Sequence, residues 1–384
     1  MAQDNPPGRI NYKGLTDPLE IRVLVLKKTT GNDPTCLLQH IYLAGRENQP
    51  PINKQGDIRT YHALSYEWGE KSHGRDITVD SVSVRIRRNL YEALKQIRSE
   101  QKDDLCLWID ALCINQEDLE EKSQQVGMMG KIFRNADSVI AWLGVASDDS
   151  EKAMDLMADH NNMRQVLMGS HIDDPMPQAI VKLCHRSYWR RVWIIQELYL
   201  ARNHVVRCGT KAIPRAEFED SLAVTHDTDL PWTWKEMENS PADQHRRARE
   251  RRDHAIQGAK FNKLRRWMTM CIDSDFQASN ERDYIYALVG ISDDCKDGQI
   301  VPNYEKRPAD VLLEAISTKS FGWFRVNNNR GSDRDYKRAI ALAEKMGLHL
   351  DLRNSIKKNF GVKISEPAES DSDVSDASIE PDSD

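Results

Sequence analysis

Runs of apolar residues recur along the first 210 residues and are separated by polar, turn-forming segments. Such runs predict strands at IRVLVL (21–26), CLLQHIYL (36–43), LCLWID (105–110), SVIAWLG (138–144) and HVVRCG (204–209). The segment YHALSYEWG (61–69) contains a further short apolar run and ends in small and polar residues. The segment ITVDSVSVRI (77–86) alternates with a period of two, which predicts a hairpin-like excursion.

Apolar residues at helical spacing lie between these runs. The segment NLYEALKQIR (89–98) has one apolar face, and Asn89 is its predicted N-cap. Asn115 is the predicted N-cap of the next helix. RRVWIIQELYLA (190–201) predicts a helix that is apolar around most of its surface. Three later segments also have helical spacing: RDYIYALVGI (282–291), PADVLLEAI (308–316) and YKRAIALAEKMG (336–347).

Strands that alternate with helices and read as continuous apolar runs indicate a parallel sheet covered by helices on both faces. We therefore predict an α/β, three-layer core from about residue 20 to about residue 210. The predicted organisation is a mobile N-terminus (1–18), a main domain (19–304), a helical C-terminal extension (305–364) and a disordered acidic tail (365–384).

Composition narrows the class of protein. The chain has 384 residues, of which 39% are hydrophobic and 30% charged, as expected for a soluble globular protein. No stretch approaches the roughly eighteen apolar residues of a membrane span, and the N-terminal MAQDNPPGRINYKG lacks the apolar core of a secretory signal. Seven scattered cysteines without a CxxC pair favour reduced thiols in a cytosolic or nuclear protein over a disulfide framework or a structural zinc site. The predicted location is cytoplasmic.

The charge is unevenly distributed. Eight acidic residues and no Lys or Arg lie between Ser365 and Asp384, so that removing this tail changes the formal net charge from −6 to +2. A nearly neutral body gives no reason to expect nucleic acid as a partner. DQHRRARERRDHAIQGAKFNKLRRW (243–267) is a basic run with a weak helical period. We predict a solvated helix or loop there, with binding of phosphate or an acidic partner as the alternative.

Candidate chemistry gathers where predicted strands end. The GxxxxGK[ST], GxGxxG, HExxH and GxSxG motifs are absent from the sequence. In open parallel sheets, ligands bind beyond the carboxyl ends of the strands. There the sequence places Ser65, Tyr66 and Trp68 after one predicted strand, and Asp110 and Asn115 after another. These residues form a predicted polar and aromatic binding rim. The alternative is that the two polar loop residues satisfy backbone groups while the aromatic side chains pack.

Glu197 is the one carboxylate in the apolar helix predicted at 190–201. The residues three and four places from it are uncharged: Trp193, Ile194, Leu200 and Ala201. A carboxylate on an apolar helix without a local partner is costly unless something else engages it. Glu197 is therefore either functional or structural, accepting backbone hydrogen bonds or pairing with a distant arginine such as Arg282. Arg190 and Arg191 are predicted to be surface residues at the helix start.

Four sequence blocks occur in a characteristic order: YHALSYEWG, LWIDALCINQEDLEEKSQQVGMMGKIFRNADSVIAWLG, YWRRVWIIQELYLA and ERDYIYALVGI. Together they strongly resemble the heterokaryon incompatibility (HET) domain of filamentous fungi, from about Ile21 to Tyr304. The resemblance implies a fungal module of non-self recognition, in which fusion of unlike strains triggers programmed cell death. Members commonly carry PSWVPDW-like segments in a C-terminal region, and no such segment follows VPNYEKRPADVLLEA here.

A second, more distant resemblance concerns Glu197. NADSVIAWLG followed by YWRRVWIIQEL is similar to the strand and the Trp-x-x-x-Glu-Leu helix of TIR domains, which implies a TIR-like, flavodoxin-like parallel core. In TIR domains that cleave NAD, this glutamate is catalytic. The resemblance therefore implies a candidate NAD hydrolase with Glu197 as the catalytic carboxylate. The residues expected to bind the substrate are Ser65, Tyr66, Trp68, Asp110, Asn115 and Trp193. No metal or organic cofactor is implied, and NAD is a candidate substrate.

Two main hypotheses remain open. In the first, oligomerisation assembles a site that hydrolyses NAD at Glu197. In the second, the chain is a non-catalytic signalling scaffold that pairs with other incompatibility and cell-death proteins; a family member without remaining activity is a third possibility. The enzyme hypothesis requires Glu197 to open into a pocket shared with Ser65, Tyr66, Trp68 or Asp110. A Glu197 sealed against an arginine, with no cavity, favours the scaffold.

Overall fold

One mixed sheet organises the computed structural model of the chain. The structure describes residues 8–29, 31–43, 50–171, 173–224, 235–238, 240–255, 262–295, 298–317, 331–348 and 356. Its strands within these residues are β1 (Glu20–Leu26), β2 (Thr35–Tyr42), β3 (Ile52–Asn53), β4 (His62–Tyr66), β5 (Arg75–Val79), β6 (Val82–Ile86), β7 (Leu105–Trp108), β8 (Ser138–Trp142), β9 (His204–Cys208) and β10 (Lys211–Pro214). The predicted acidic tail (365–384) and residues 1–7 of the predicted mobile N-terminus lie outside the described residues.

The strand order is β10-β9-β8-β4-β7-β1-β2-β5-β6, with β3 paired to β2. The four central strands β9, β8, β4 and β7 are parallel to one another. Numbered by their place in the chain, these four follow the order 2-1-3-4 across the sheet, which is the order of flavodoxin-like folds. The α/β class is therefore confirmed. The sheet becomes mixed beyond β7, because β1 pairs antiparallel with both β7 and β2.

The strands form because their apolar runs are buried on both faces. All seven residues of β1 are buried, as are four of the five in β8. The predicted hairpin is present as β5 and β6, joined by Asp80 and Ser81. Both turn residues have positive φ, 47° and 68°, as in the two-residue turns that match the twist of a hairpin.

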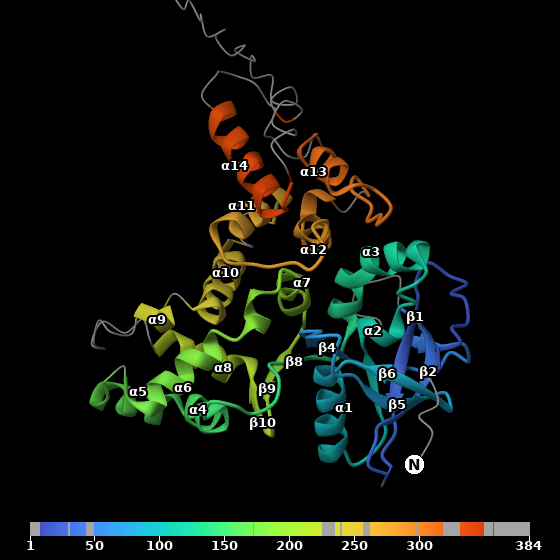
Figure 1. Ribbon diagram of the computed structural model, residues 1–384, viewed down its shortest axis with the longest axis horizontal. Coiled ribbons are helices and arrows are strands. Elements are labelled where there is room, and N and C mark those ends of the chain that lie inside the picture. Colours follow the sequence, from blue (N-terminus) through green and yellow to red (C-terminus); the bar gives the residue numbers. More distant parts are fainter. Residues whose placement is uncertain are drawn as a thin grey trace, which may run out of the picture.

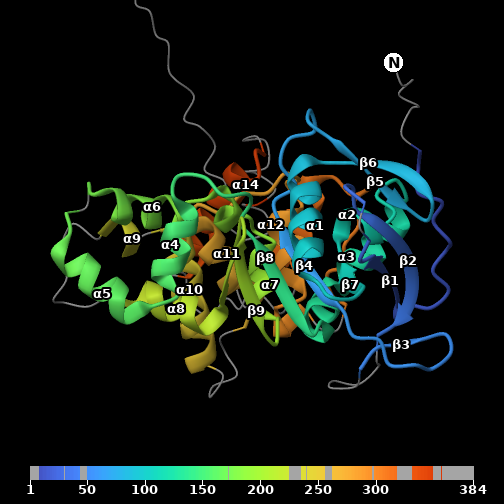
Figure 2. The ribbon, with the colours of Figure 1, turned by 90° about the horizontal axis from the view of Figure 1, so that it is seen from below.

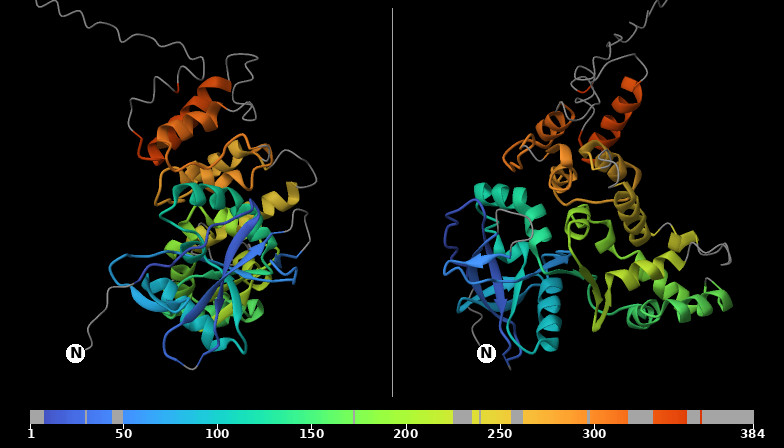
Figure 3. Two further views of the ribbon diagram at one scale, coloured as in Figure 1. Left: turned by 90° about the vertical axis from the view of Figure 1, so that its right-hand side faces the viewer. Right: turned by 180° about the vertical axis from the view of Figure 1, so that it is seen from behind.

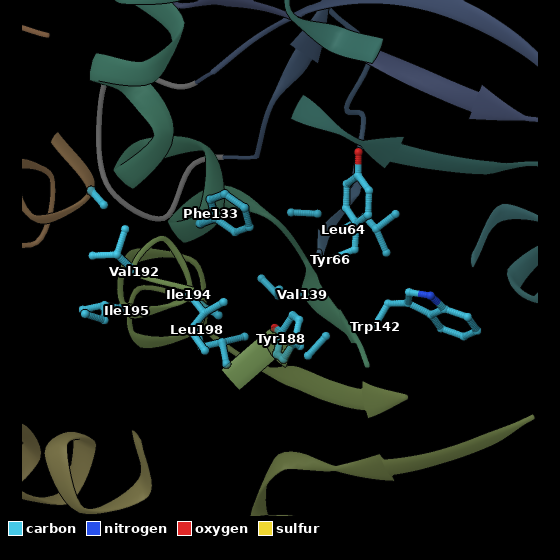
Figure 4. Packing of buried hydrophobic residues seen from close by; sticks show 14 of the residues in the cluster. Leu64, Tyr66, Phe133, Val139, Trp142, Tyr188, Val192, Ile194, Ile195 and Leu198 are labelled. Carbon is cyan, nitrogen blue, oxygen red and sulfur yellow. The ribbon is translucent and has the colours of Figure 1, made fainter. Parts of the chain in front are cut away.

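Helices cover both faces of the sheet. Those of the α/β core are α1 (Arg88–Glu100), α2 (Asp110–Cys113), α3 (Leu119–Asn135) and α7 (Ile194–Tyr199). In Figure 1, α1 lies below the central strands, whereas α3 and α7 lie above them and contact each other. Right-handed crossovers in a 2-1-3-4 sheet place the first connecting helix on the face opposite to the later ones. Figure 4 shows Ile194 and Leu198 of α7 close to Phe133 of α3 and Val139 of β8.

A group of helices extends the sheet beyond β10. Its members are α4 (Ser150–Met157), α5 (His160–Gly169), α6 (Pro175–Cys184), α8 (Arg215–Val224), α9 (Lys235–Glu238) and α10 (Pro241–Ala255). Figure 2 shows them gathered on the side of the β9–β10 edge. The sequence indicated only a polar stretch where α4, α5 and α6 lie, because each of these helices is only 8 to 10 residues long.

The C-terminal helices form a further layer over α3 and α7. They are α11 (Leu264–Asp273), α12 (Asp283–Val289), α13 (Pro308–Ser317) and α14 (Gly331–Lys345). α12 contacts both α3 and α7, and Figure 3 shows this orange and red group stacked beyond them. The segments predicted as helices at 282–291, 308–316 and 336–347 correspond to α12, α13 and α14.

The basic run is not a solvated element where the structure describes its side chains. In α10, Asp243 is fully buried and pairs with Arg246 and Arg247, each through a 2.8 Å contact. Arg249 is 8% exposed and donates to the carbonyl oxygen of Leu198 at 3.0 Å. The prediction of a solvated helix is wrong here, because a buried carboxylate and backbone oxygens compensate the arginine charges.

Two predicted N-caps are also wrong. Arg87, not Asn89, occupies the N-cap position of α1. The Asn89 side chain instead donates to the carbonyl oxygen of Glu67 and accepts from Trp142 Nε1, which ties α1 to β4 and β8. Asp118 caps α3 by accepting from the backbone N–H of Glu121. Asn115 Oδ1 instead accepts from the backbone N–H of Glu117, in the loop before α3.

All seven cysteines are free thiols. Among the residues that the structure describes, no helix combines the length and the apolar character that crossing a bilayer requires. Within the same residues, no group of three or more His, Cys, Asp or Glu side chains is arranged to hold a metal ion.

Candidate functional site

Glu197 belongs to α7, and its side chain contacts the carboxyl end of β4. It is 3% exposed. The Ser65 hydroxyl, near the end of β4, donates to Glu197 Oε2. Arg191 donates two hydrogen bonds of 3.1 Å, from Nη1 to Oε2 and from Nη2 to Oε1. The Tyr188 hydroxyl lies 2.7 Å from Ser65 Oγ. Both carboxylate oxygens of Glu197 therefore accept hydrogen bonds from donors within the protein.

Arg191 lies in a turn before α7. A 3-10 helix, η1 (Ser187–Arg190), ends just before it, and α7 begins only at Ile194. Because the chain turns between them, a residue six positions before Glu197 reaches its carboxylate. The prediction of Arg191 as a surface residue is wrong, since 17% of its side chain is exposed. Burial opposes its charge, but the Glu197 carboxylate outweighs burial and raises the pKa of the guanidinium.

Arg282 and Arg190 bind other groups. Arg282 Nε donates to the carbonyl oxygen of Lys306 at 2.6 Å, so the prediction that it pairs with Glu197 is wrong. Arg190 pairs with Asp275 near the surface, with 26% of its side chain exposed. Glu197 therefore has one counter-ion among the described residues, and it comes from the adjoining turn.

Asp110 is a second carboxylate at the same end of the sheet. It begins α2, just after β7. Trp68 Nε1 donates to its Oδ2 at 2.8 Å, and the backbone N–H of Ala111 donates to its Oδ1 at 2.7 Å. Burial raises the pKa of Asp110 to about 6; Arg191 opposes this rise and Glu197 adds to it. Asp110, Arg191 and Glu197 thus form one electrostatic cluster at the carboxyl ends of β4 and β7.

A cavity of about 430 Å³ lies next to this cluster, within the size range of small-molecule sites. Tyr66 and Trp68 line it from the end of β4, and Asn115 and Gln116 from the loop before α3. Its other walls come from residues 8–12, from β6, and from the starts of α1 and α2. Neither Glu197 nor Ser65 lines the cavity.

This part of the chain matches a known family. Residues 61–197 match the family described as heterokaryon incompatibility protein (HET). This segment is therefore similar to a HET domain. The matched segment runs from the start of β4 to Glu197 and so covers the parallel strands β4, β7 and β8 with the charged cluster at their ends.

One curated relative supports the same assignment. Heterokaryon incompatibility protein 6, OR allele, of Neurospora crassa is 30% identical over 199 residues, which cover 40% of this chain and 29% of the relative. The chain therefore spans less than a third of the length of that relative. No solved structure matches the chain.

The matched segment brings most of the predicted rim together. Asp110 belongs to the charged cluster, and Ser65 donates to Glu197 in that cluster. Tyr66, Trp68 and Asn115 line the cavity. Burial raises the pKa of Tyr66 well above its usual value, and the Asp110 carboxylate beside it acts in the same direction. The grouping of these five side chains follows from their position at the carboxyl ends of β4 and β7.

Trp193 is separate from this group. Its Nε1 donates to Asp283 Oδ2 at 3.0 Å, and Tyr304 donates to the other oxygen of that carboxylate at 2.8 Å. Trp193 therefore connects the matched segment to α12 and does not line the cavity. Its assignment to substrate binding has no geometric support here.

Four residues of the site were not predicted from the sequence. They are Arg191 in the charged cluster, Tyr188 beside it, and Arg85 and Arg87 in the cavity wall. No local spacing links Tyr188 to Ser65, which is 123 residues away. A signal for Arg85 and Arg87 was present in the sequence, because the alternating segment 77–86 ends in Arg85-Ile86 and two more arginines follow it just before the predicted helix.

Proposed function

We propose that this chain acts in fungal incompatibility, as a cytoplasmic module through which recognition of non-self leads to cell death. The match of residues 61–197 to the HET family and the incompatibility protein of Neurospora crassa support the role. The proposed partners are other incompatibility and cell-death proteins, and further copies of this chain.

The geometry favours signalling without catalysis at Glu197. The observation that carries this conclusion is the pair of 3.1 Å hydrogen bonds from Arg191, together with the donor from Ser65. A ribose hydroxyl would have to displace one of these donors and reach a residue that is 3% exposed. Removing a donor from a buried carboxylate costs more than the net contribution of an ordinary hydrogen bond.

Induced expression in a filamentous fungus tests the role, with cell viability as the measurement. Wild type is expected to arrest growth. Glu197→Gln and Asp243→Asn are compared with it, because both disturb buried ion pairs but Asp243 lies in α10, outside the charged cluster. Both variants should lose killing in proportion to their loss of soluble protein on a blot. Wild-type protein that accumulates and leaves growth unchanged contradicts the proposed role.

The second candidate is cleavage of NAD, which the location of the two carboxylates favours. Glu197 and Asp110 lie at the carboxyl ends of parallel strands, beside a cavity with aromatic walls. Breaking the bond between ribose C1′ and nicotinamide passes through an oxocarbenium-like state that one carboxylate can stabilise. Nicotinamide leaves neutral, and water then adds to C1′ to give ADP-ribose and a proton. In this candidate, assembly of several copies opens the Arg191–Glu197 pair.

Total cellular NAD, measured in the same cells, separates the two candidates. Growth arrest with unchanged NAD supports the signalling module. A fall in NAD with wild type, absent for Glu197→Gln at equal protein level and still present for Asp243→Asn, supports cleavage and assigns Glu197 its role.

A further inference from the structure

The cavity beside Asp110 has a strongly basic wall. Three arginines and one glutamate line it: Arg9, Arg85, Arg87 and Glu117. Arg9 and Glu117 pair at 3.0 Å at the rim, where both are largely exposed. Because Arg9 and Glu117 offset each other, Arg85 and Arg87 give the cavity a net positive charge.

Arg87 is the best placed of these cations. Its guanidinium lies 4.9 Å from the ring centre of Trp68, and its Nη1 donates to the carbonyl oxygen of Gly69 at 2.6 Å. These contacts hold the side chain in place without neutralising it. No carboxylate of the described residues forms an ion pair with Arg87. Arg85 contacts Asp76 only through exposed, long hydrogen bonds of 3.3 and 3.4 Å, which contribute little in water.

The start of α1 adds to the positive field. Arg87 is its N-cap residue, and Leu90 in its first turn also lines the cavity. No side chain caps this end, and no acidic residue lies in the first turn. The free N–H groups at the beginning of a 13-residue helix favour an anion.

The remaining walls suit a planar ring. Tyr12, Tyr66 and Trp68 supply aromatic surface, and Asn115 and Gln116 supply amide groups. Tyr12 is fixed by a hydrogen bond from its hydroxyl to the carbonyl oxygen of Leu112 at 3.2 Å. Aromatic and apolar walls with a few polar groups are typical of small-molecule sites, and here the polar groups include cations.

We propose that this cavity binds a phosphorylated ligand with a planar ring, of the class of nucleoside phosphates. The arginines and the start of α1 hold the phosphates, the aromatic walls pack against the ring, and the amides contact its polar edge. The site does not require Glu197 to be accessible, and it stands independently of the proposed incompatibility role.

Calorimetric titration of the purified full chain with ADP tests the proposal, with adenosine and pyrophosphate as the two halves of the probe. ADP is expected to bind with a Kd below about 1 mM, more tightly than either half and more weakly as salt is added. Arg87→Gln should weaken ADP binding about 10- to 100-fold, the effect of losing a charge-assisted hydrogen bond. Arg88→Gln is the matched control, because Arg88 is the neighbouring arginine, does not line the cavity and is 65% exposed.

Arg85→Gln is the second variant, because it lies on an exposed strand surface and leaves the start of α1 intact. It should also weaken ADP binding while the circular dichroism spectrum stays that of wild type. Four results overturn the proposal: no saturable binding of ADP, equal binding of adenosine and ADP, equal binding of pyrophosphate and ADP, or equal losses for Arg87→Gln and Arg88→Gln.

Discussion

Arg191 and Glu197 are six residues apart in the chain and are joined by two hydrogen bonds of 3.1 Å. The pair is possible because η1 and α7 are two separate short helices with a turn between them. It connects that turn to β4 through Ser65, which donates to Glu197. A feature that looked like an isolated carboxylate is thus one end of a buried, fully paired ion pair.

Because α12 lies close to α7 and α3, adding one methyl group at Gly290 should lower the stability of the protein. A Cβ at Gly290 would collide with the Gln196 side chain of α7, and Gly290 already lies 3.1 to 3.3 Å from a Cβ built on Gly130. Gly290→Ala should therefore destabilise the protein by about 1 to 3 kcal/mol, measured by urea denaturation.

Gly169→Ala is the control for that substitution. Gly169 is the last residue of α5, and nothing lies within 4 Å of a Cβ built there. Alanine should leave stability unchanged or raise it by up to about 1 kcal/mol. Equal stability of the two alanine variants would show that α12 does not pack closely on α7.

The buried part of α10 depends on Asp243. Asp243→Asn should cost about 3 to 5 kcal/mol, because it leaves Arg246, with 7% of its side chain exposed, without its buried counter-ion. Glu250→Gln removes a partner of the same arginine that is 52% exposed, and should cost less than about 1 kcal/mol. Thermal unfolding of both variants measures the difference. Similar small losses would mean that α10 is solvated after all.

The raised pKa of Asp110 predicts that the stability of the protein depends on pH. Its pKa is about 6 in the folded chain against an ordinary value of 3.8, so between these values the folded state binds more protons than the unfolded state. Its contribution is fully present below about pH 4 and is lost as pH rises through about 6, by up to about 3 kcal/mol.

The measurement for Asp110 is the unfolding free energy of wild type minus that of Asp110→Asn, at a series of pH values. The variant keeps a side-chain oxygen that can accept from Trp68 but cannot ionise. The difference should fall from pH 4 to pH 7. A difference that stays constant, or rises over that range, contradicts the raised pKa of Asp110.

Much of the central fold follows from the sequence, because the strands of a sheet buried on both faces are continuous apolar runs. This rule alone predicts the strands at IRVLVL and SVIAWLG. The rule fails where charge is buried through partners distant in sequence. Nothing near Arg249 in the sequence indicates the carbonyl oxygen of Leu198, 51 residues away, that accepts its hydrogen bond.

The candidate site was predictable to the same degree. Ser65, Tyr66, Trp68, Asp110 and Asn115 come together because parallel strands place their carboxyl ends at one edge. Arg191 escaped detection because a search at three and four residues assumes one continuous helix. Trp193 was misplaced for a related reason. It precedes a short α7 and donates to Asp283, a residue whose proximity no local spacing indicates.

The central claim is that the pair of Arg191 and Glu197 is structural. A double-mutant cycle on these two residues tests it most directly. The unfolding free energy is measured for wild type, Arg191→Met, Glu197→Gln and the double variant, with Arg190→Gln as the surface control. The account predicts a loss of about 3 to 5 kcal/mol for Arg191→Met. It also predicts a double variant that is more stable than the two single losses imply, by about 1 to 3 kcal/mol. Additive losses would contradict a structural role for the pair. So would a Glu197→Gln variant more stable than wild type, because that result is expected of a carboxylate kept for catalysis at the expense of stability.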